Sequence, residues 1–419
     1  MKMGWKKSLA VGLASVALLA GCGNSGSNNA KKDDGDAGGK PVLKVTADAQ
    51  WHDFLKENKK DFEKANGCKV EMVDKDMFEA LEALQLDGPA GTAPDVLIAP
   101  YDRIGILGRT GQLAEVKLNE EAKYDETDKK QVTADGKIYG APAVIESLVM
   151  YYNKDLVEKA PTSFDELEAL AKDSRFDFPD EKGKNTGFLA KWTDFYYAYG
   201  LLSGYGAHLF GESGTDTSKV GLNSPEAIQG IEYATGWFKN VWPKGMKDVK
   251  GAGDFVTQSF IKGKTAAVIA GPWDAKTFKE AGVKYGVAKI PTLKNGQPYK
   301  PFAGGKGFVL SNYSKQKELG QKFLDWLTSN DIQQKMYAKL NEVPANENVR
   351  ASVDKNDELT QAVINTYKDA VPMPNIPEMN EVWAGAENLM FDAASGKQTA
   401  KEAANNSVKT IEQAIHEKY

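Results

Sequence analysis

Strand patterns and helix patterns alternate along the chain from Val42 onward. The apolar spacing predicts strands at residues 43–47, 68–73 and 96–99, with helices at residues 51–65 and 78–86 between them. The run Val96-Leu97-Ile98-Ala99 contains no polar residue, which is typical of a parallel strand that helices cover on both faces. This order of strand, helix and strand predicts an α/β fold.

The remainder of the chain continues this order and then becomes richer in helix patterns. Ser163, with Glu166 three residues later, predicts a capped helix start, and residues 266–270 predict another buried strand. Residues 319–327, 380–394 and 400–415 have apolar spacing near the helical period, so we expect helices that cover the sheets. Extended segments at 143–147 and 288–292 are the predicted crossings between two lobes, and 419 residues suffice for two or three compact units.

The first residues predict an export signal with a lipid anchor. Lys2, Lys6 and Lys7 precede a short apolar run at residues 9–19, whereas a membrane span needs about 20 apolar residues. Leu19-Ala20-Gly21-Cys22 then resembles the lipobox of bacterial lipoproteins, which implies that Cys22 carries acyl chains such as palmitate. Residues 1–21 are the predicted signal peptide, and residues 22–40 a flexible tether without large apolar side chains. The alternative is an ordinary secreted protein with an incidental Cys22.

Charge and the rarer residue types argue against several functions. With 53 basic and 58 acidic residues the chain has a net charge of -5, so we expect no nucleic-acid partner. The three histidines, His52, His208 and His416, are far apart and join no cysteine cluster, so we expect neither a metal site nor a cofactor. Cys68 is expected to be a buried strand residue. Glycoside hydrolysis stays open, because many acidic residues supply chance carboxylate pairs.

Charged and aromatic residues follow several predicted strands. Asp102 and Arg103 come after the strand at 96–99, and Trp273 comes after the strand at 266–270. Glu146 is a charge within an otherwise apolar strand, and a buried carboxylate is costly without a partner. Ligands of open α/β sheets bind beyond the carboxyl ends of the strands, so these residues are candidates for a binding cleft.

The combination of aromatic rings with carboxylates and a guanidinium suits a sugar. The CH faces of a sugar ring lie on an aromatic surface, while its hydroxyls bond to charged groups. Trp192, Tyr196 and Trp383 add further rings. A single tryptophan is more often a core residue, so the pattern as a whole carries the prediction of a neutral, polyhydroxylated ligand.

Four motifs in sequence order resemble the maltose/maltodextrin-binding proteins of ABC importers. They lie at residues 94–103, 150–156, 271–273 and 373–377, and read PDVLIAPYDR, MYYNKDL, GPW and MPNIP. The resemblance extends from about residue 42 to the last residue. It is closest to the lipid-anchored proteins of Gram-positive bacteria, which share the stretches at residues 141–148 and 192–197.

This resemblance implies a periplasmic-binding-protein fold, in which two α/β lobes close over a ligand by hinge bending. We place the first lobe at residues 41–146 and 292–345, and the second at residues 147–291 and 346–419. The implied function is that of a monomeric receptor, without enzymatic activity, on the extracellular face of the cell membrane. It delivers maltodextrins to the permease subunits of the importer.

The resemblance also implies roles for single residues. Asp102 and Arg103 resemble sugar-hydroxyl ligands of the first lobe, and Glu146 resembles the hinge-strand carboxylate. Trp273 and Trp383 resemble stacking surfaces of the second lobe. Met373 resembles a ligand-binding position beside these two tryptophans. Tyr196 and Trp192 resemble positions in the aromatic stretch of the family.

Two departures from the enterobacterial pattern are visible. Ala99 stands where the enterobacterial protein of this family has a tryptophan. Asp48-Ala49-Gln50-Trp51 stands where the enterobacterial protein has an Asp-Lys pair. We therefore expect Trp51 to supply a different stacking surface and the subsites to be rearranged. Two alternatives remain: a receptor for another oligosaccharide, and a surface glycoside hydrolase that uses Glu146 with Asp102.

Overall fold

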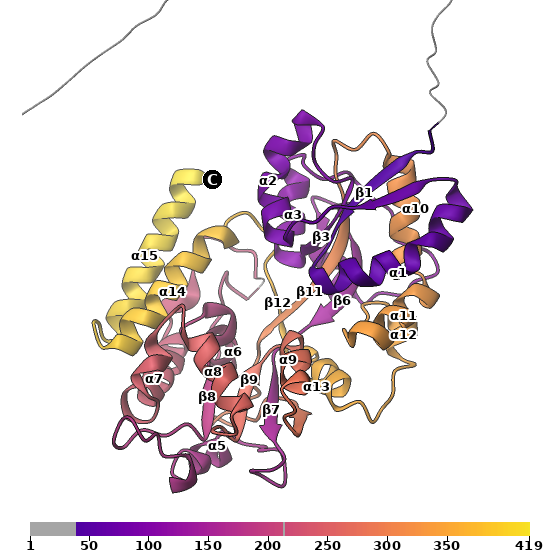
Figure 1. Cartoon of the computed structure of the whole chain (residues 1–419). Helices are drawn as coiled ribbons and strands as arrows, with labels where there is room; N and C mark the ends of the chain where they lie inside the picture. Colours follow the sequence, from indigo (N-terminus) through magenta and orange to yellow (C-terminus); the bar gives the residue numbers. More distant parts are fainter. Residues whose placement is uncertain (1–38, 213) are drawn as a thin grey trace, which may run out of the picture. The chain divides into compact units, whose positions relative to one another are not determined.

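Two larger β-sheets, each with its own apolar core, organise the computed structural model, which describes residues 39–212 and 214–419 (Figure 1). The first sheet has the strand order β12-β11-β3-β1-β2, and β6 also pairs with β11. Its strands are β1 (Val42–Thr46), β2 (Lys69–Met72), β3 (Val96–Pro100), β6 (Ala141–Glu146), β11 (Phe302–Leu310) and β12 (Val371–Pro372). Strands β1, β2 and β3 are parallel, and β11 runs antiparallel to both β3 and β6.

Helices that follow these strands cover the first sheet. They are α1 (Ala49–Asn66), α2 (Met77–Ala90), α3 (Tyr101–Arg109), α10 (Lys317–Leu327), α11 (Asn330–Leu340) and α12 (Glu347–Arg350). Gly67 ends α1 because its φ of 62° is left-handed, a conformation that glycine adopts without strain. A short helix, α4 (Glu126–Gln131), and the antiparallel pair β4 (Thr133–Ala134) and β5 (Lys137–Ile138) lie between α3 and β6 in sequence.

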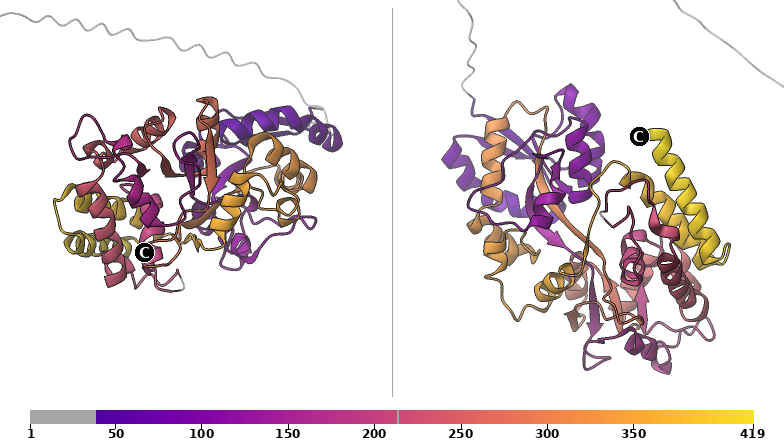
Figure 2. Two further views of the ribbon diagram at one scale, coloured as in Figure 1. Left: turned by 90° about the horizontal axis from the view of Figure 1, so that it is seen from below. Right: turned by 180° about the vertical axis from the view of Figure 1, so that it is seen from behind.

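The second sheet has the strand order β10-β7-β9-β8. Its strands are β7 (Val149–Asn153), β8 (Phe188–Ala190), β9 (Ala267–Ala270) and β10 (Tyr285–Ala288). The helices around it are α5 (Phe164–Leu170), α6 (Phe195–Tyr205), α7 (Pro225–Asn240), α8 (Ala252–Ile261), α9 (Ala275–Glu280), α13 (Glu358–Tyr367), α14 (Met379–Ser395) and α15 (Ala400–Lys418). Helices α14 and α15 pack side by side in opposite directions (Figure 2), with Ser407 donating to the carbonyl of Gly385 at 2.8 Å.

In the described part of the chain, three segments connect the two cores: the junction of β6 and β7, strand β11, and the residues after α11, where Met336 lies in the first core and Val343 in the second. Strand β6 leads directly into β7, and the backbone of Ile145 donates to the carbonyl of Val343 at 2.9 Å. Strand β11 belongs to both cores, because Phe302 is buried in one and Phe308 in the other. Ile290, within the segment 288–292, is buried in the second core, as are Leu293 and Phe302 further along the chain.

The strands and helices expected at residues 43–99, 266–270, 319–327, 380–394 and 400–415 are confirmed, with ends that differ by a few residues. The capped start at Ser163 is also confirmed, since its hydroxyl accepts from the backbone of Glu166 at 3.3 Å. Cys68 is buried, one residue before β2. The predicted signal peptide and Cys22 lie outside the described residues. Within residues 39–212 and 214–419, no helix combines the length and apolar character needed to cross a membrane.

Candidate functional site

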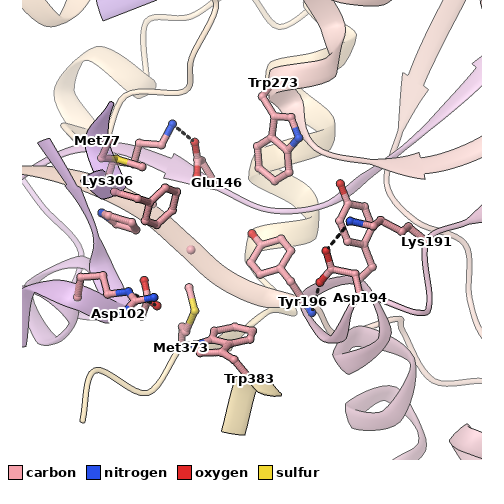
Figure 3. Close-up of a pocket in the computed structure, with 16 residues that line it drawn as sticks. Met77, Asp102, Glu146, Lys191, Asp194, Tyr196, Trp273, Lys306, Met373 and Trp383 are labelled. Carbon is pink, nitrogen blue, oxygen red and sulfur yellow. Dashed lines mark hydrogen bonds and ion pairs between the residues drawn. The ribbon is translucent and has the colours of Figure 1, made fainter. Parts of the chain in front are cut away.

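A cavity of about 560 Å³ lies between the two sheets, where side chains from both lobes face each other (Figure 3). In Figure 3, Asp102 and Lys306 lie on one side of this main cavity, opposite Tyr196 and Trp273. Seven of the nine residues predicted as ligand contacts line it: Asp102, Arg103, Glu146, Tyr196, Trp273, Met373 and Trp383.

Asp102 and Arg103 occupy the first turn of α3, which begins directly after β3. Burial raises the pKa of Asp102, and the neighbouring guanidinium of Arg103 offsets part of that rise. Arg103 Nε lies 3.7 Å from Oδ2 of Asp102, and Arg103 Nη1 donates to Oδ1 of Asn380 on α14 at 3.1 Å. Arg103 therefore reaches from the first lobe to a helix of the second.

The hinge strands β6 and β11 carry a charge cluster at the cavity. Lys306 Nζ lies 3.1 Å from Oε1 of Glu146 and 3.2 Å from Oδ2 of Asp48. Burial alone lowers the pKa of Lys306, but the carboxylates of Glu146, Glu342 and Asp48 outweigh burial and raise it above its usual value. Lys306 is thus held as a cation among acids, with an ammonium group close to the ligand space.

Glu342 lies behind this cluster and is almost fully buried. Trp51 Nε1 donates to its Oε2 at 2.7 Å, and Gln50 Nε2 donates to its Oε1. Burial raises the pKa of Glu342 to about 7, although Lys306 opposes that rise. A neutral Glu342 at mildly acidic pH reduces the repulsion among the acids around Lys306.

Aromatic side chains form the wall on the side of the second lobe. Asp194 caps α6 by accepting from the backbone of Tyr196 at 2.9 Å, which places Tyr196 at the cavity. Trp273 is 40% exposed, and its ring centroid lies 6.1 Å from that of Tyr196. A Cβ on Gly271 would come within 2.1 Å of the Trp273 ring, so only glycine permits this ring position. Trp383 packs edge-on against Phe302, with ring centroids 6.0 Å apart.

Trp51 and Trp192 differ from the prediction, because neither lines the cavity. Both side chains are 0% exposed. Trp51 lies in the first core with its ring centroid 5.1 Å from that of Phe308, and its indole Nε1 donates a hydrogen bond to Glu342. Trp192 packs 5.0 Å from Trp242 and donates to Tyr299 at 3.2 Å. Their indole faces are covered by the cores, so neither is available to a ligand in this conformation.

Several lining residues were not foreseen from the sequence. Lys306 carries a recognisable signal, since it is the one charge in the apolar, glycine-rich strand β11, just as Glu146 is in β6. Met77 and Phe78 begin α2, and the helix pattern alone does not show that they face a cavity. Asp194 and Lys191 also line it, and their side chains form a 3.0 Å ion pair.

The chemistry of the cavity is that of a binding site for a neutral polar ligand. Apolar ring faces stand opposite hydrogen-bonding groups, so a ligand with both apolar faces and hydroxyls is satisfied on both sides. Among residues 39–212 and 214–419 there is no group of three His, Cys, Asp or Glu side chains arranged to hold a metal ion.

Comparison with known proteins gives consistent matches. The family model for bacterial extracellular solute-binding proteins matches residues 58–363. The maltodextrin-binding protein MdxE of Bacillus subtilis is 50% identical over 415 residues, covering 99% of both chains.

Two crystal structures resemble the chain in fold and sequence. The maltose-binding protein MalE of Listeria monocytogenes, solved with maltose, has a TM-score of 0.85 and 60% identity over 91% of this chain and 99% of its own. MalX of Streptococcus pneumoniae, solved with maltopentaose, has a TM-score of 0.86 and 51% identity over 89% of this chain and 100% of its own. The periplasmic-binding-protein fold expected from the sequence is thereby confirmed.

Proposed function

This chain belongs to the bacterial extracellular solute-binding proteins, and from that premise we propose that it is the maltose and maltodextrin receptor of an ABC importer. The main cavity is the observation that carries the proposal. It sets the rings of Tyr196, Trp273 and Trp383 against Asp102 and Arg103, as a chain of glucose units requires. The names of the relatives, a maltodextrin-binding protein and two maltose- or maltopentaose-bound structures, support the same ligand class.

The proposed mechanism is closure of two lobes around the sugar. The ligand contacts Asp102 in one lobe and Trp273 in the other, so it favours the closed state by its higher affinity for that state. The proposed lobes are those expected from the sequence, residues 41–146 with 292–345 and residues 147–291 with 346–419. One boundary is moved from residue 292 into β11, because Ile290, Leu293 and Phe302 are buried in the second core.

The proposed receptor is held on the extracellular face of the membrane by acyl chains on Cys22. A tethered receptor stays near its permease subunits after export, and the relatives from Streptococcus pneumoniae are named as solute-binding lipoproteins of a maltooligosaccharide ABC transporter. Mass spectrometry of the membrane-extracted protein tests the anchor. A Cys22 without acyl chains contradicts the proposed anchor.

We further propose that the receptor acts as a monomer.

Binding without catalysis is the proposed activity. The rival, hydrolysis by Glu146 with Asp102, is tested by incubating the protein with maltoheptaose and measuring new reducing ends. Release of reducing ends above the buffer control would favour the rival.

Titration calorimetry of the full-length chain with maltotriose tests the ligand itself. We expect saturable binding with one sugar per chain. No heat and no change in tryptophan fluorescence would refute the maltodextrin assignment, and a thermal-shift panel of other oligosaccharides then identifies the alternative ligand.

A further inference from the structure

A second, smaller cavity adjoins the main cavity between α2 and α3. Its volume is about 200 Å³. Phe78 and Arg103 line both cavities, so the two spaces border on the same two side chains. The smaller cavity is therefore within reach of a ligand that extends from the main cavity past these side chains.

Phe78 lies at this junction with its ring open to solvent. Asp76 caps α2 by accepting from the backbone of Phe78 and Glu79 at 2.9 and 3.1 Å, which fixes the first turn of the helix. The Phe78 side chain is 47% exposed, whereas Leu81 and Leu84 on the same helix are 5% and 0% exposed. A large ring that is left open beside a cavity is an available stacking surface.

The remainder of the smaller cavity combines apolar and polar groups. Ile106 and Leu107 of α3 contribute apolar surface, and Glu82, Gln85 and Gln112 contribute carboxylate and amide groups. An apolar surface with a few converging hydrogen-bonding groups is the usual composition of a small-molecule site. The groups present suit hydroxyls, since amides both donate and accept.

Arg103 adds free hydrogen-bonding capacity at the junction. Its Nη1 donates to Asn380, which also lines the smaller cavity. The Arg103 side chain as a whole is 35% exposed. A guanidinium carries five N–H donors, so the exposed part of this group can bind a hydroxyl of a chain that passes beside it.

We propose that the smaller cavity is an additional subsite for an α-glucan chain, with Phe78 as the stacking surface for units beyond those in the main cavity. The inference rests on the proposed function, since it assigns the same class of oligosaccharide to both cavities. The shared lining by Phe78 and Arg103 favours this occupant over an unrelated ligand. Phe78 is then a determinant of chain-length preference.

The test compares maltose with maltoheptaose by titration calorimetry of the full-length chain. Phe78→Ala is expected to weaken maltoheptaose binding about tenfold more than maltose binding. Phe78→Tyr retains a ring and is expected to keep the wild-type ratio of the two affinities. Gln85→Ala, which lines only the smaller cavity, is expected to weaken maltoheptaose alone.

Leu86→Ala is the matched control. Leu86 lies on the same helix and is 78% exposed, but it lines neither cavity, so both affinities are expected to stay at the wild-type values. If Phe78→Ala and Gln85→Ala both leave the affinity ratio unchanged, the subsite is refuted and the proposed function stands. If the wild-type chain binds neither sugar, the proposed function fails and the subsite fails with it.

Discussion

Lys306 Nζ lies 3.1 Å from Oε1 of Glu146, on the strand that pairs with its own. The two strands, β6 and β11, are also segments that connect the two cores. Asp48 contributes a second carboxylate at 3.2 Å, and Glu342 adds a third acid nearby. One cation therefore lies among several acids at the place where the ligand cavity and the hinge meet.

Removal of this cation is expected to destabilise the protein. Lys306→Met leaves Glu146 and Asp48 without their partner in a largely buried setting. We expect the free energy of unfolding to fall by about 3 kcal/mol, measured by urea denaturation. Lys339→Met is the control, because Lys339 pairs with Glu57 where both side chains are more than half exposed, at 52% and 56%. Equal effects of the two substitutions would contradict the role of Lys306.

Glu342 is expected to make stability depend on pH. Burial raises its pKa from an ordinary 4.5 to about 7, so between these values the folded chain keeps a proton that the unfolded chain releases. The stabilisation is complete below the unfolded pKa and is lost as the pH rises through the folded pKa. Glu342→Gln stays neutral at every pH. As the pH rises from 4.5 to about 7, its free energy of unfolding should therefore fall by about 1–3 kcal/mol less than that of the wild type.

The comparison with wild type at each pH isolates Glu342 from other titrating groups. Burial also raises the pKa of Asp274 to about 6 and that of Asp128 to about 7, but both remain in the variant. Their contributions cancel in the difference. If the free energies of unfolding of the two proteins changed in parallel with pH, Glu342 would have the same pKa in the folded and the unfolded chain, which contradicts the prediction.

The aromatic residues of the second lobe are expected to contribute to the affinity for maltotriose. Trp273→Ala and Trp383→Ala each remove a ring from the cavity, so each is expected to weaken maltotriose binding about tenfold, measured by titration calorimetry. Phe391→Ala is the control: Phe391 is 37% exposed on α14, the helix of Trp383, and does not line the cavity. Unchanged affinity in both tryptophan variants would place the sugar elsewhere.

The order of elements was predictable because it depends on local pattern. The apolar run of β3 and the left-handed Gly67 after α1 are visible in the sequence and occur as expected. The positions of Asp102 and Trp273 also followed, since each comes directly after a strand and the carboxyl ends of strands border the cavity.

The exposure of single aromatic residues was not predictable in the same way. Trp51 is covered by Phe308 and Trp192 by Tyr299, partners that are distant in sequence. Periodicity shows which face of a helix is apolar, but not which other segment covers it. The acidic partners of Lys306 were not predictable for a similar reason, because Asp48, Glu146 and Glu342 are distant in sequence and only the fold brings them to it.

Substitutions at two adjacent glycines in β11 should have different effects, one on the free energy of unfolding and the other on sugar affinity. A Cβ at Gly305 would lie 2.4 Å from both Cε2 of Tyr101 and the carbonyl oxygen of Val144, which cannot be relieved by a side-chain rotation alone. Gly305→Ala is therefore expected to lower the free energy of unfolding by about 1–3 kcal/mol.

A Cβ at Gly304 would instead lie 3.2 Å from the hydroxyl of Tyr196 and 3.7 Å from Cε of Met373, at the wall of the main cavity. Gly304→Ala should leave urea denaturation close to wild type and weaken maltotriose several-fold, because the added methyl group takes up space beside the bound sugar. Each variant is the control for the other. If Gly304→Ala lost stability while keeping its affinity, the cavity beside Tyr196 would not be where the sugar binds.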